Sequence, residues 1–247
     1  LLKICMWHSK SVSVILATYR EKSSIRQAIE SFLATGLVDE LVVVNNNAEA
    51  GTEEEVKKTS ARLVRETRQG YGFAFRKGIQ EVKGDYIVLC EPDNTFVAKD
   101  IERFLAKAEN FQVVLGSRTR GTTVMNPLRS FGNVVAAKTI QILFATNTLS
   151  DIGCTYKLFH KEALQKLAPY FTRVDPLFAT ELVLLAASCR IPFAEIPITF
   201  QQRVGTSAIT PHWRKWFGLG IQVFLYIWLF WFKNKIHDSH KLSMPNL

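Results

Sequence analysis

The sequence DYIVLCEPDN at residues 85–94 joins an uncharged apolar run to two carboxylates. The apolar part, 86–90, is typical of a strand that is buried on both faces of a parallel sheet, between layers of helices. Pro92 cannot continue a central strand, so Glu91 and Asp93 are expected where the strand emerges at the carboxyl edge of the sheet. Open α/β sheets bind ligands at that edge, and the stretch therefore predicts a binding site.

Two interpretations of Glu91 and Asp93 are open from these residues alone. Carboxylates one residue apart repel each other, and a hard divalent cation, Mg²⁺ or Mn²⁺, would hold them together while also binding phosphate oxygens. The other interpretation is an acidic turn that caps the helix expected to begin near Lys99.

Length and charge limit the classes of function. The chain has 247 residues, enough for one α/β domain with a full core and a short appendage. Its net charge of +9 favours an anionic partner, such as nucleotide phosphates, acidic lipid headgroups or nucleic acid. Nucleic acid is disfavoured, because no basic run has the spacing of a nucleic-acid motif and the aromatic residues do not alternate as base stacking requires.

The cysteines and the first ten residues predict where the protein resides. The four cysteines are far apart and form neither a CxxC zinc pattern nor a dense disulfide framework. Isolated cysteines of this kind usually serve as small apolar side chains, and they indicate a reducing environment. Residues 1–10 mix charged and apolar side chains and do not resemble a signal peptide, so we expect the catalytic part to stay in the cytoplasm.

Buried strands and amphipathic helices alternate along the chain. This order predicts an α/β fold with a doubly wound, mostly parallel sheet, right-handed crossovers and helices on both faces. Strands are expected at 11–18, 41–44, around Leu63, and at 86–90, 111–116 and 193–200. Helices are expected after Ser23, Glu53, Tyr71 and Lys99, and at 127–146, 177–188 and 216–232.

The segment GYG at 70–72 precedes a helix, as the glycines of a dinucleotide-binding fingerprint do. Phe75 stands where the third glycine of that fingerprint belongs, and the preceding strand is weak. The fingerprint is therefore disfavoured.

Two of the expected helices are unusually apolar. The helix at 127–146 is apolar on more than one side, which is typical either of a helix packed under a neighbour or of one at a membrane interface. The helix at 177–188 carries Glu181 as its only charge. A carboxylate there is costly unless it has a partner or a task, although ordinary capping near a helix start is the alternative.

The stretch 216–232 is apolar apart from Gln222 and has basic residues at both flanks. As a helix it would be roughly 26 Å long, slightly short of the roughly 30 Å hydrocarbon core, so that a span is marginal. Aromatic residues at both ends and flanking cations predict membrane contact, along the bilayer surface or across it. The alternative is a helix buried against the domain or in a dimer contact.

The order of the motifs resembles the GT-A glycosyltransferases of family 2, and within them the dolichyl-phosphate mannose synthase branch of polyprenyl-phosphate glycosyltransferases. The similar motifs are ATYRE at 17–21, VNNN at 44–47, GYGFA at 70–74, GDY at 84–86, EPD at 91–93, GSR at 116–118 and RVGTS at 203–207, with Arg129, Asn133 and 151–159. The resemblance divides the chain into a tail at 1–10, a GT-A domain at 11–210, an apolar membrane-associated helix at 211–235 and a polar tail at 236–247.

The resemblance implies roles for individual residues. The nucleotide sugar would contact Thr18, Tyr19, Glu21, Asn45, Asn46, Gly70, Glu91 and Asp93. Glu91 and Asp93 would hold Mg²⁺ or Mn²⁺. The acceptor phosphate would contact Arg118, Arg129, Arg203 and Ser207, since the guanidinium fork matches phosphate oxygens. Asp93, Arg118, Glu181 and Arg203 are the candidate catalytic residues.

Two positions depart from the family pattern. Asn45 stands where an aspartate is usual, so the family's preference for a base does not transfer. Glu91 stands where the first acid of the metal motif is usually aspartate, and its extra methylene loosens the expected site.

The implied reaction is an inverting transfer of a sugar from a nucleotide-diphosphate donor, of the GDP-mannose or UDP-glucose type, to a polyprenyl or dolichyl phosphate. A lipid phosphate is ionised at neutral pH and needs no base. One alternative is a glycosyltransferase acting on a glycolipid or glycan hydroxyl, with Glu181 as the general base. Another is a non-catalytic subunit that anchors partners at the membrane. In each case we expect the cytoplasmic side of a membrane, with a homo-oligomer possible.

Overall fold

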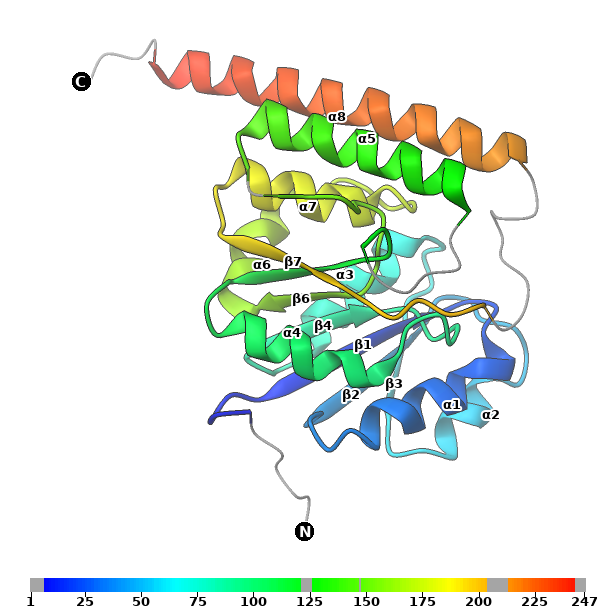
Figure 1. Ribbon diagram of the computed structural model, residues 1–247. Helices are drawn as coiled ribbons and strands as arrows, with labels where there is room; N and C mark the ends of the chain where they lie inside the picture. The colour runs from blue at the N-terminus through cyan, green and yellow to red at the C-terminus, as the bar shows by residue number, and fades with distance from the viewer. Residues whose placement is uncertain (1–6, 121–125, 147, 204–212, 243–247) are drawn as a thin grey trace.

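The protein forms a mixed sheet with helices on both faces (Figure 1). The computed structural model describes residues 7–120, 126–146, 148–203 and 213–242. Within these residues the sheet has seven strands in the order β3-β2-β1-β4-β6-β5-β7, and β6 is antiparallel to both of its neighbours. The strands are β1 (Val12–Thr18), β2 (Glu40–Asn45), β3 (Arg62–Arg65), β4 (Tyr86–Cys90), β5 (Val113–Ser117), β6 (Lys157–His160) and β7 (Phe193–Pro197).

The helices form two layers. They are α1 (Lys22–Leu33), α2 (Thr52–Lys57), α3 (Tyr71–Glu81), α4 (Ile101–Ala108), α5 (Pro127–Phe144), α6 (Lys161–Leu167), α7 (Phe178–Ser188) and α8 (Trp213–Leu242). Side chains of α1, α2 and α4 pack in one core, and those of α3, α5, α6 and α7 pack in the other. The predicted doubly wound, mostly parallel sheet with helices on both faces is confirmed.

Strand β4 shows why its sequence is a continuous apolar run. Ile87 and Leu89 enter the core beneath α3, α5 and α7, whereas Val88 and Cys90 enter the core beneath α1 and α4. Every residue of the strand is buried. A strand covered on both faces exposes neither face to water, and so loses the usual alternation of polar and apolar residues.

The register brings the carboxyl ends of the central strands to one edge. Leu16 of β1 pairs with Cys90 of β4, and Thr18 pairs with Asn45 of β2. Because β6 runs in the opposite direction, with Leu89 paired to Lys157, the segment 151–155 that precedes it reaches the same edge. Strand β6 is absent from the strands expected from the sequence, because it is four residues long and begins with a lysine.

Helix α8 lies along α5 on the outside of the helical layer (Figure 1). Ile227 is buried, and the indole nitrogen of Trp231 donates to the carbonyl oxygen of Leu143 over 3.0 Å. The helix continues to Leu242, so part of the expected polar tail is helical. None of the helices within the described ranges is both long and apolar enough to cross a membrane. Of the two kinds of membrane contact left open for 216–232, a span across the bilayer is therefore not supported.

Candidate active site

The turn after β4 holds Asp93 at the carboxyl edge of the sheet. Asp93 is 2% exposed, and its Oδ1 accepts hydrogen bonds from the backbone nitrogen and the hydroxyl of Thr95 over 3.0 and 2.5 Å. The hydroxyl of Ser24 donates to the carbonyl oxygen of Pro92 over 2.7 Å and ties the turn to α1. The other carboxylate oxygen of Asp93, Oδ2, lies 3.0 Å from Nη1 of Arg203.

Glu21 shares Arg203 with Asp93. Its Oε2 accepts hydrogen bonds from the backbone nitrogens of Tyr19 and Arg20 over 2.7 and 2.8 Å, which fixes the carboxylate at the end of β1. Its Oε1 lies 2.7 Å from Nη2 of Arg203. One guanidinium therefore bridges carboxylates that are far apart in the sequence, and the structure brings these three candidate residues together.

Glu91 lies near Asp93 but has different partners. Its Oε1 accepts a hydrogen bond from the Thr155 hydroxyl over 2.7 Å, and that hydroxyl lies 2.6 Å from the hydroxyl of Tyr71. Burial, and then the charge of Asp93, raise the pKa of Glu91. A bound cation would act against both effects. Neither carboxylate caps the helix near Lys99, so the capping interpretation is wrong.

The two carboxylates fit a metal ion that binds together with a phosphorylated substrate. In the ranges that the structure describes, no group of three or more His, Cys, Asp or Glu side chains could hold a metal. Mg²⁺ commonly keeps several waters and binds one or two carboxylates plus substrate phosphates. Glu91 and Asp93 match that ligand set.

Arg118, at the end of β5, is oriented by the buried carboxylate of Asp151. Its Nε and Nη2 donate to Oδ2 and Oδ1 of Asp151 over 2.7 and 2.9 Å, and its backbone nitrogen donates to Oδ2 over 2.9 Å. The side-chain amide of Asn133 also donates to Asp151. Burial alone would raise the pKa of Asp151, but the adjacent charge of Arg118 and these hydrogen bonds hold it at about 2.

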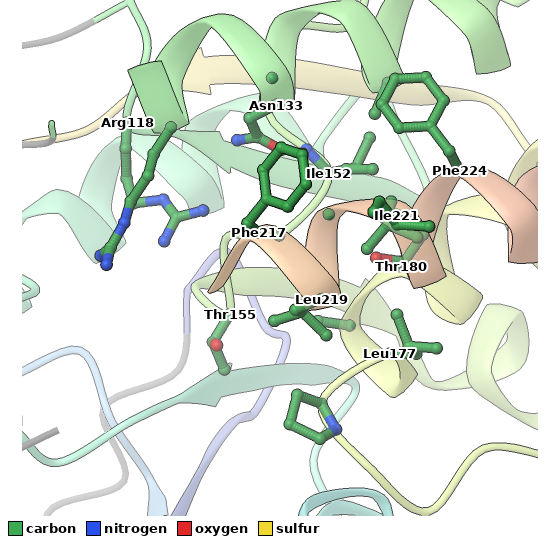
Figure 2. Close-up of a pocket in the computed structure, with 18 of the residues that line it drawn as sticks. Arg118, Asn133, Ile152, Thr155, Leu177, Thr180, Phe217, Leu219, Ile221 and Phe224 are labelled. Carbon is green, nitrogen blue, oxygen red and sulfur yellow. The ribbon is translucent and has the colours of Figure 1, made fainter. Parts of the chain in front are cut away.

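A cavity of about 680 Å³ extends from Glu91 and Arg118 into the space between α5, α7 and α8 (Figure 2). Its polar end is formed by Glu91, Arg118, Arg129 and Thr155. Figure 2 shows Arg118 on one side of the cavity and Leu177, before α7, with apolar side chains of α8 on the other. The apolar lining includes Leu128, Phe131, Ala136, Ile152, Leu177, Leu219, Ile221, Val223, Phe224 and Leu225.

Arg129, in the first turn of α5, shares the polar end of the cavity with Arg118. Burial, and then the positive charge of Arg118, lower the pKa of Arg129. An anion bound beside both guanidiniums would relieve their repulsion and form charge-assisted hydrogen bonds. This end of the cavity is therefore suited to a phosphate group.

Asn45 and Asn46 make contacts within the protein at the end of β2. The amide nitrogen of Asn45 donates to Glu53 over 2.6 Å, and its oxygen accepts from the backbone of Ala48 over 2.7 Å. Asn46 accepts a hydrogen bond from the backbone nitrogen of Gly70 over 2.9 Å. Asn46 thus ties Gly70 to the sheet edge.

The glycines at 70 and 72 permit a close approach of two backbone segments. A Cβ atom on Gly70 would lie 2.6 Å from the carbonyl oxygen of Val174, and one on Gly72 would lie 2.5 Å from that of Arg173. The backbone nitrogen of Gly72 donates to the Val174 carbonyl oxygen over 2.8 Å. Their spacing thus has a packing reason, in agreement with the rejection of a dinucleotide fingerprint.

Glu181 is fully buried in α7 and connects three parts of the protein. Its Oε1 accepts hydrogen bonds from the backbone nitrogen of Thr172 over 2.9 Å and from the hydroxyl of Tyr226 in α8 over 2.9 Å. Its Oε2 accepts from the backbone nitrogen of Arg173 over 3.0 Å. Among the described residues, Glu181 is not part of the cavity lining. Its contacts are those of a structural carboxylate.

Replacing Glu181 by glutamine is expected to destabilise the fold by about 1–3 kcal/mol, because the new amide group would direct a donor at existing donors. Urea denaturation measures the loss, and Glu162→Gln, on the exposed side of α6, is the control. If Glu181→Gln kept full stability and lost more than about a hundredfold in kcat, the size expected of a general base, Glu181 would be catalytic instead.

Several residues of this site were not assigned roles from the sequence. Thr155 and Asp151 lie in the segment before β6, and Tyr71 is the first residue of α3. Glu195 of β7 accepts hydrogen bonds from the backbone nitrogens of Ser150 and Asp151, each over 2.8 Å, and so supports that segment. The motif DIGCTYKLF at 151–159 was the sequence signal for these residues. Spacing along the chain does not show that the motif contacts Arg118 or Glu91.

Lys157 is a buried lysine at the start of β6. It is 1% exposed, and its ammonium donates to the carbonyl oxygen of Cys154. Burial lowers its pKa to about 8. Of the remaining candidates, Thr18 lies beside Glu21, and Ser207 lies outside the described residues.

Comparisons with known proteins show the family of the chain and its fold. Residues 13–168 match the family model "Glycosyl transferase family 2". The low-salt glycan biosynthesis hexosyltransferase Agl6 of Haloferax volcanii is 26% identical over 206 residues, covering 79% of this chain and 49% of that protein. The dolichyl-phosphate hexose transferase of the same organism is 27% identical over 208 residues, covering 81% of this chain and 87% of that protein.

A dolichyl-phosphate beta-glucosyltransferase of Saccharomyces cerevisiae is 23% identical over 227 residues, covering 79% of this chain and 68% of that protein. The chain thus spans about half the length of Agl6 and more of the other two relatives. Glucosyl-3-phosphoglycerate synthase from Mycobacterium tuberculosis, solved with Mn²⁺, uridine diphosphate and phosphoglyceric acid, has the same fold. That structure has a TM-score of 0.72 and 16% identity, covering 97% of this chain and 81% of its own. The family model covers well over half of the present sequence, and the chain therefore belongs to glycosyl transferase family 2.

Proposed function

We propose that this chain transfers a sugar, with inversion, from a nucleoside diphosphate donor to a polyprenyl phosphate at a membrane surface. The observation that carries the proposal is the continuity of the cavity, which joins Glu91 and two arginines to an apolar space between α5, α7 and α8. A phosphate with a long hydrocarbon chain matches both ends. The names of the Haloferax and Saccharomyces dolichyl-phosphate transferases support the same acceptor class.

In this reaction the residues of the chain bind and orient two anionic substrates. In this proposal Arg118 and Arg129 hold the acceptor phosphate, with Arg203 and Ser207 as further contacts. The proposed donor contacts are Thr18, Tyr19, Glu21, Asn45, Asn46 and Gly70. Glu91 and Asp93 would hold Mg²⁺ or Mn²⁺, which supplies charge stabilisation to the leaving diphosphate.

The acceptor phosphate requires no general base, because its second ionisation lies near pH 6. The burial of Glu181 and its contacts with backbone nitrogens agree with such an acceptor. A hydroxyl acceptor would instead need a base near the reacting oxygen.

We further propose that the protein lies on the membrane through one apolar outer face. The exposed apolar residues of this face are Leu128, Phe131, Val135 and Ile142 of α5, and Phe217, Ile221, Leu225, Trp228, Leu229 and Phe232 of α8. A patch of this composition beside a cavity is typical of contact with lipid or protein. The exposed Lys138 and Lys233 on the same helices favour acidic lipid headgroups.

A pair of glycine substitutions tests the acceptor site. A Cβ atom added to Gly132 or to Gly218 would meet no neighbouring atom within 4 Å, but of the two only Gly132 belongs to the cavity lining in the described residues. Gly132→Leu is therefore expected to raise KM for polyprenyl phosphate by about tenfold through overpacking, while Gly218→Leu leaves it unchanged. KM for the nucleotide sugar should stay constant in both.

The assay uses purified protein, Mn²⁺ or Mg²⁺, a panel of nucleotide sugars and polyprenyl phosphate in mixed vesicles, with lipid-linked sugar as the product. Absence of product with every donor would overturn the proposed reaction. If Gly132→Leu and Gly218→Leu changed KM for polyprenyl phosphate equally, the acceptor would not bind in the cavity. Transfer to a soluble hydroxyl acceptor alone would favour the other class of glycosyltransferase.

A further inference from the structure

Arg203 lies beside Asp93 and occupies the position that a metal bound to this carboxylate would need. Its two terminal nitrogens contact different acids, Nη1 with Asp93 at 3.0 Å and Nη2 with Glu21 at 2.7 Å. Both acids are buried, with Asp93 2% and Glu21 9% exposed. Because two buried carboxylates repel each other, a cation between them stabilises the folded protein.

The oxygens of Asp93 leave no second place for a cation. Oδ1 is directed at the backbone nitrogen and the hydroxyl of Thr95, which are both donors. Oδ2 is therefore the oxygen available to a metal, and it is the one that Arg203 contacts. A divalent ion on Oδ2 would lie close to the guanidinium, and the two positive charges would repel each other.

Glu21 is positioned to keep Arg203 when Asp93 releases it. The Glu21 carboxylate is fixed by the backbone nitrogens of Tyr19 and Arg20, independently of Asp93. Loss of the Nη1 contact would leave the Nη2 contact intact. Among the described residues the buried Nε of Arg203 has no hydrogen-bond partner, so this guanidinium has unused capacity to bind an anion.

We propose that Arg203 is a placeholder cation, which neutralises Asp93 in the metal-free protein and is displaced from Asp93 when the divalent metal binds. The displaced guanidinium stays on Glu21 and turns its free donors to a phosphate of the nucleoside diphosphate, in addition to its proposed contact with the acceptor phosphate. This role rests on the proposed metal-dependent function, and it makes Arg203 a residue that sets metal affinity in addition to contacting substrate.

The exchange predicts coupling between metal and nucleotide. Without a nucleotide, the metal has to compete with Arg203 for Asp93, and its affinity is reduced. A nucleoside diphosphate offers the displaced guanidinium a new partner, so that nucleotide and metal each strengthen the binding of the other. Removal of Arg203 should weaken this mutual effect.

The test measures Mn²⁺ binding to the full chain by electron paramagnetic resonance of free Mn²⁺, with and without UDP or GDP. Without nucleotide, Arg203→Gln is expected to bind Mn²⁺ about tenfold more tightly than the unsubstituted protein, a coupling of ordinary size. Arg203→Lys should be intermediate, because one ammonium cannot hold both acids in the same way. In Arg203→Gln, the gain in Mn²⁺ affinity caused by UDP or GDP should shrink.

Arg62→Gln is the matched control. Arg62 also bridges two carboxylates, Glu40 at 3.0 Å and Glu81 at 2.9 Å, but it lies at the start of β3, away from the Asp93 edge. The Arg62→Gln protein should bind Mn²⁺ with the same affinity as the unsubstituted protein.

Two failures can be told apart. If the unsubstituted protein and Arg203→Gln bind Mn²⁺ equally, or the variant binds it more weakly, the placeholder role is wrong and the metal site stands. If no protein binds Mn²⁺ even with UDP or GDP, the metal-dependent function fails and the placeholder role with it. Should Arg203→Gln not fold, an Arg203→Lys protein that binds Mn²⁺ no more tightly than the unsubstituted one overturns the inference.

Discussion

An Asp93→Asn protein is expected to lose about a hundredfold to a thousandfold in kcat while keeping its fold, the size found when one group that stabilises transition-state charge is removed. An amide binds a hard divalent cation more weakly than a carboxylate, and it leaves Arg203 without its second acid. The measurement is the rate of lipid-linked sugar formation at saturating substrates, with circular dichroism to check folding.

Asp85→Asn is the matched control for Asp93→Asn. Asp85 precedes the same strand at the opposite edge of the sheet, where it accepts hydrogen bonds from the backbone nitrogen and the hydroxyl of Ser11 over 2.8 and 2.9 Å. Its replacement should change stability but not kcat. An Asp93→Asn protein as active as Asp85→Asn would show that Asp93 does not hold a catalytic metal.

Replacing Asp151 by asparagine is expected to lower the free energy of unfolding by about 3–5 kcal/mol, because it leaves the guanidinium of Arg118, a side chain only 19% exposed, without its counter-charge. Asp151 is fully buried, so solvent does not compensate for the loss. Activity should fall as well, since Arg118 would lose the partner that orients it toward the cavity. Urea denaturation measures the stability change.

The stabilising effect of Asp151 should also depend on pH. Its pKa is lowered from 3.8 to about 2 in the folded protein, so the folded state binds fewer protons than the unfolded state between these values. The stability that Asp151 contributes is therefore complete above about pH 4 and is lost as the pH falls toward about 2. The difference between the unsubstituted protein and Asp151→Asn should shrink over the same interval.

Glu30→Gln is the control for the Asp151 prediction. Glu30 pairs with Arg26 over 2.8 Å, but both side chains are about half exposed. Exposed pairs contribute little, so this variant should unfold like the unsubstituted protein. If Asp151→Asn were as stable as Glu30→Gln, the buried pair with Arg118 would not be a main support of the site.

The sheet could be predicted from the sequence because its strands are buried on both faces. Strand 86–90 is apolar throughout, and Pro92 ends it before two acids. The same reasoning correctly placed the ends of β1, β2 and β4 at one edge. It did not detect β6, whose Lys157 looks like a surface residue until the fold buries it.

For the C-terminal helix, the sequence indicated apolar character but not which side would be covered. Packing against α5 and α7 buries Ile227, while Leu229 and Phe232 stay exposed. A composition without strong periodicity is compatible with burial, dimer contact or membrane contact. The division into a covered and an exposed side depends on the position of neighbouring helices.

The sequence by itself determined the alternation of strands and helices, the edge at which Glu91 and Asp93 emerge, and the family resemblance, because these depend on local patterns and on motif order. The tertiary structure decided the partners of each charge. It placed Arg203 between Glu21 and Asp93, Asp151 beneath Arg118, and Glu181 among backbone donors. Such pairings join segments that are distant in the chain, and only the packing of the complete fold brings them within hydrogen-bond distance.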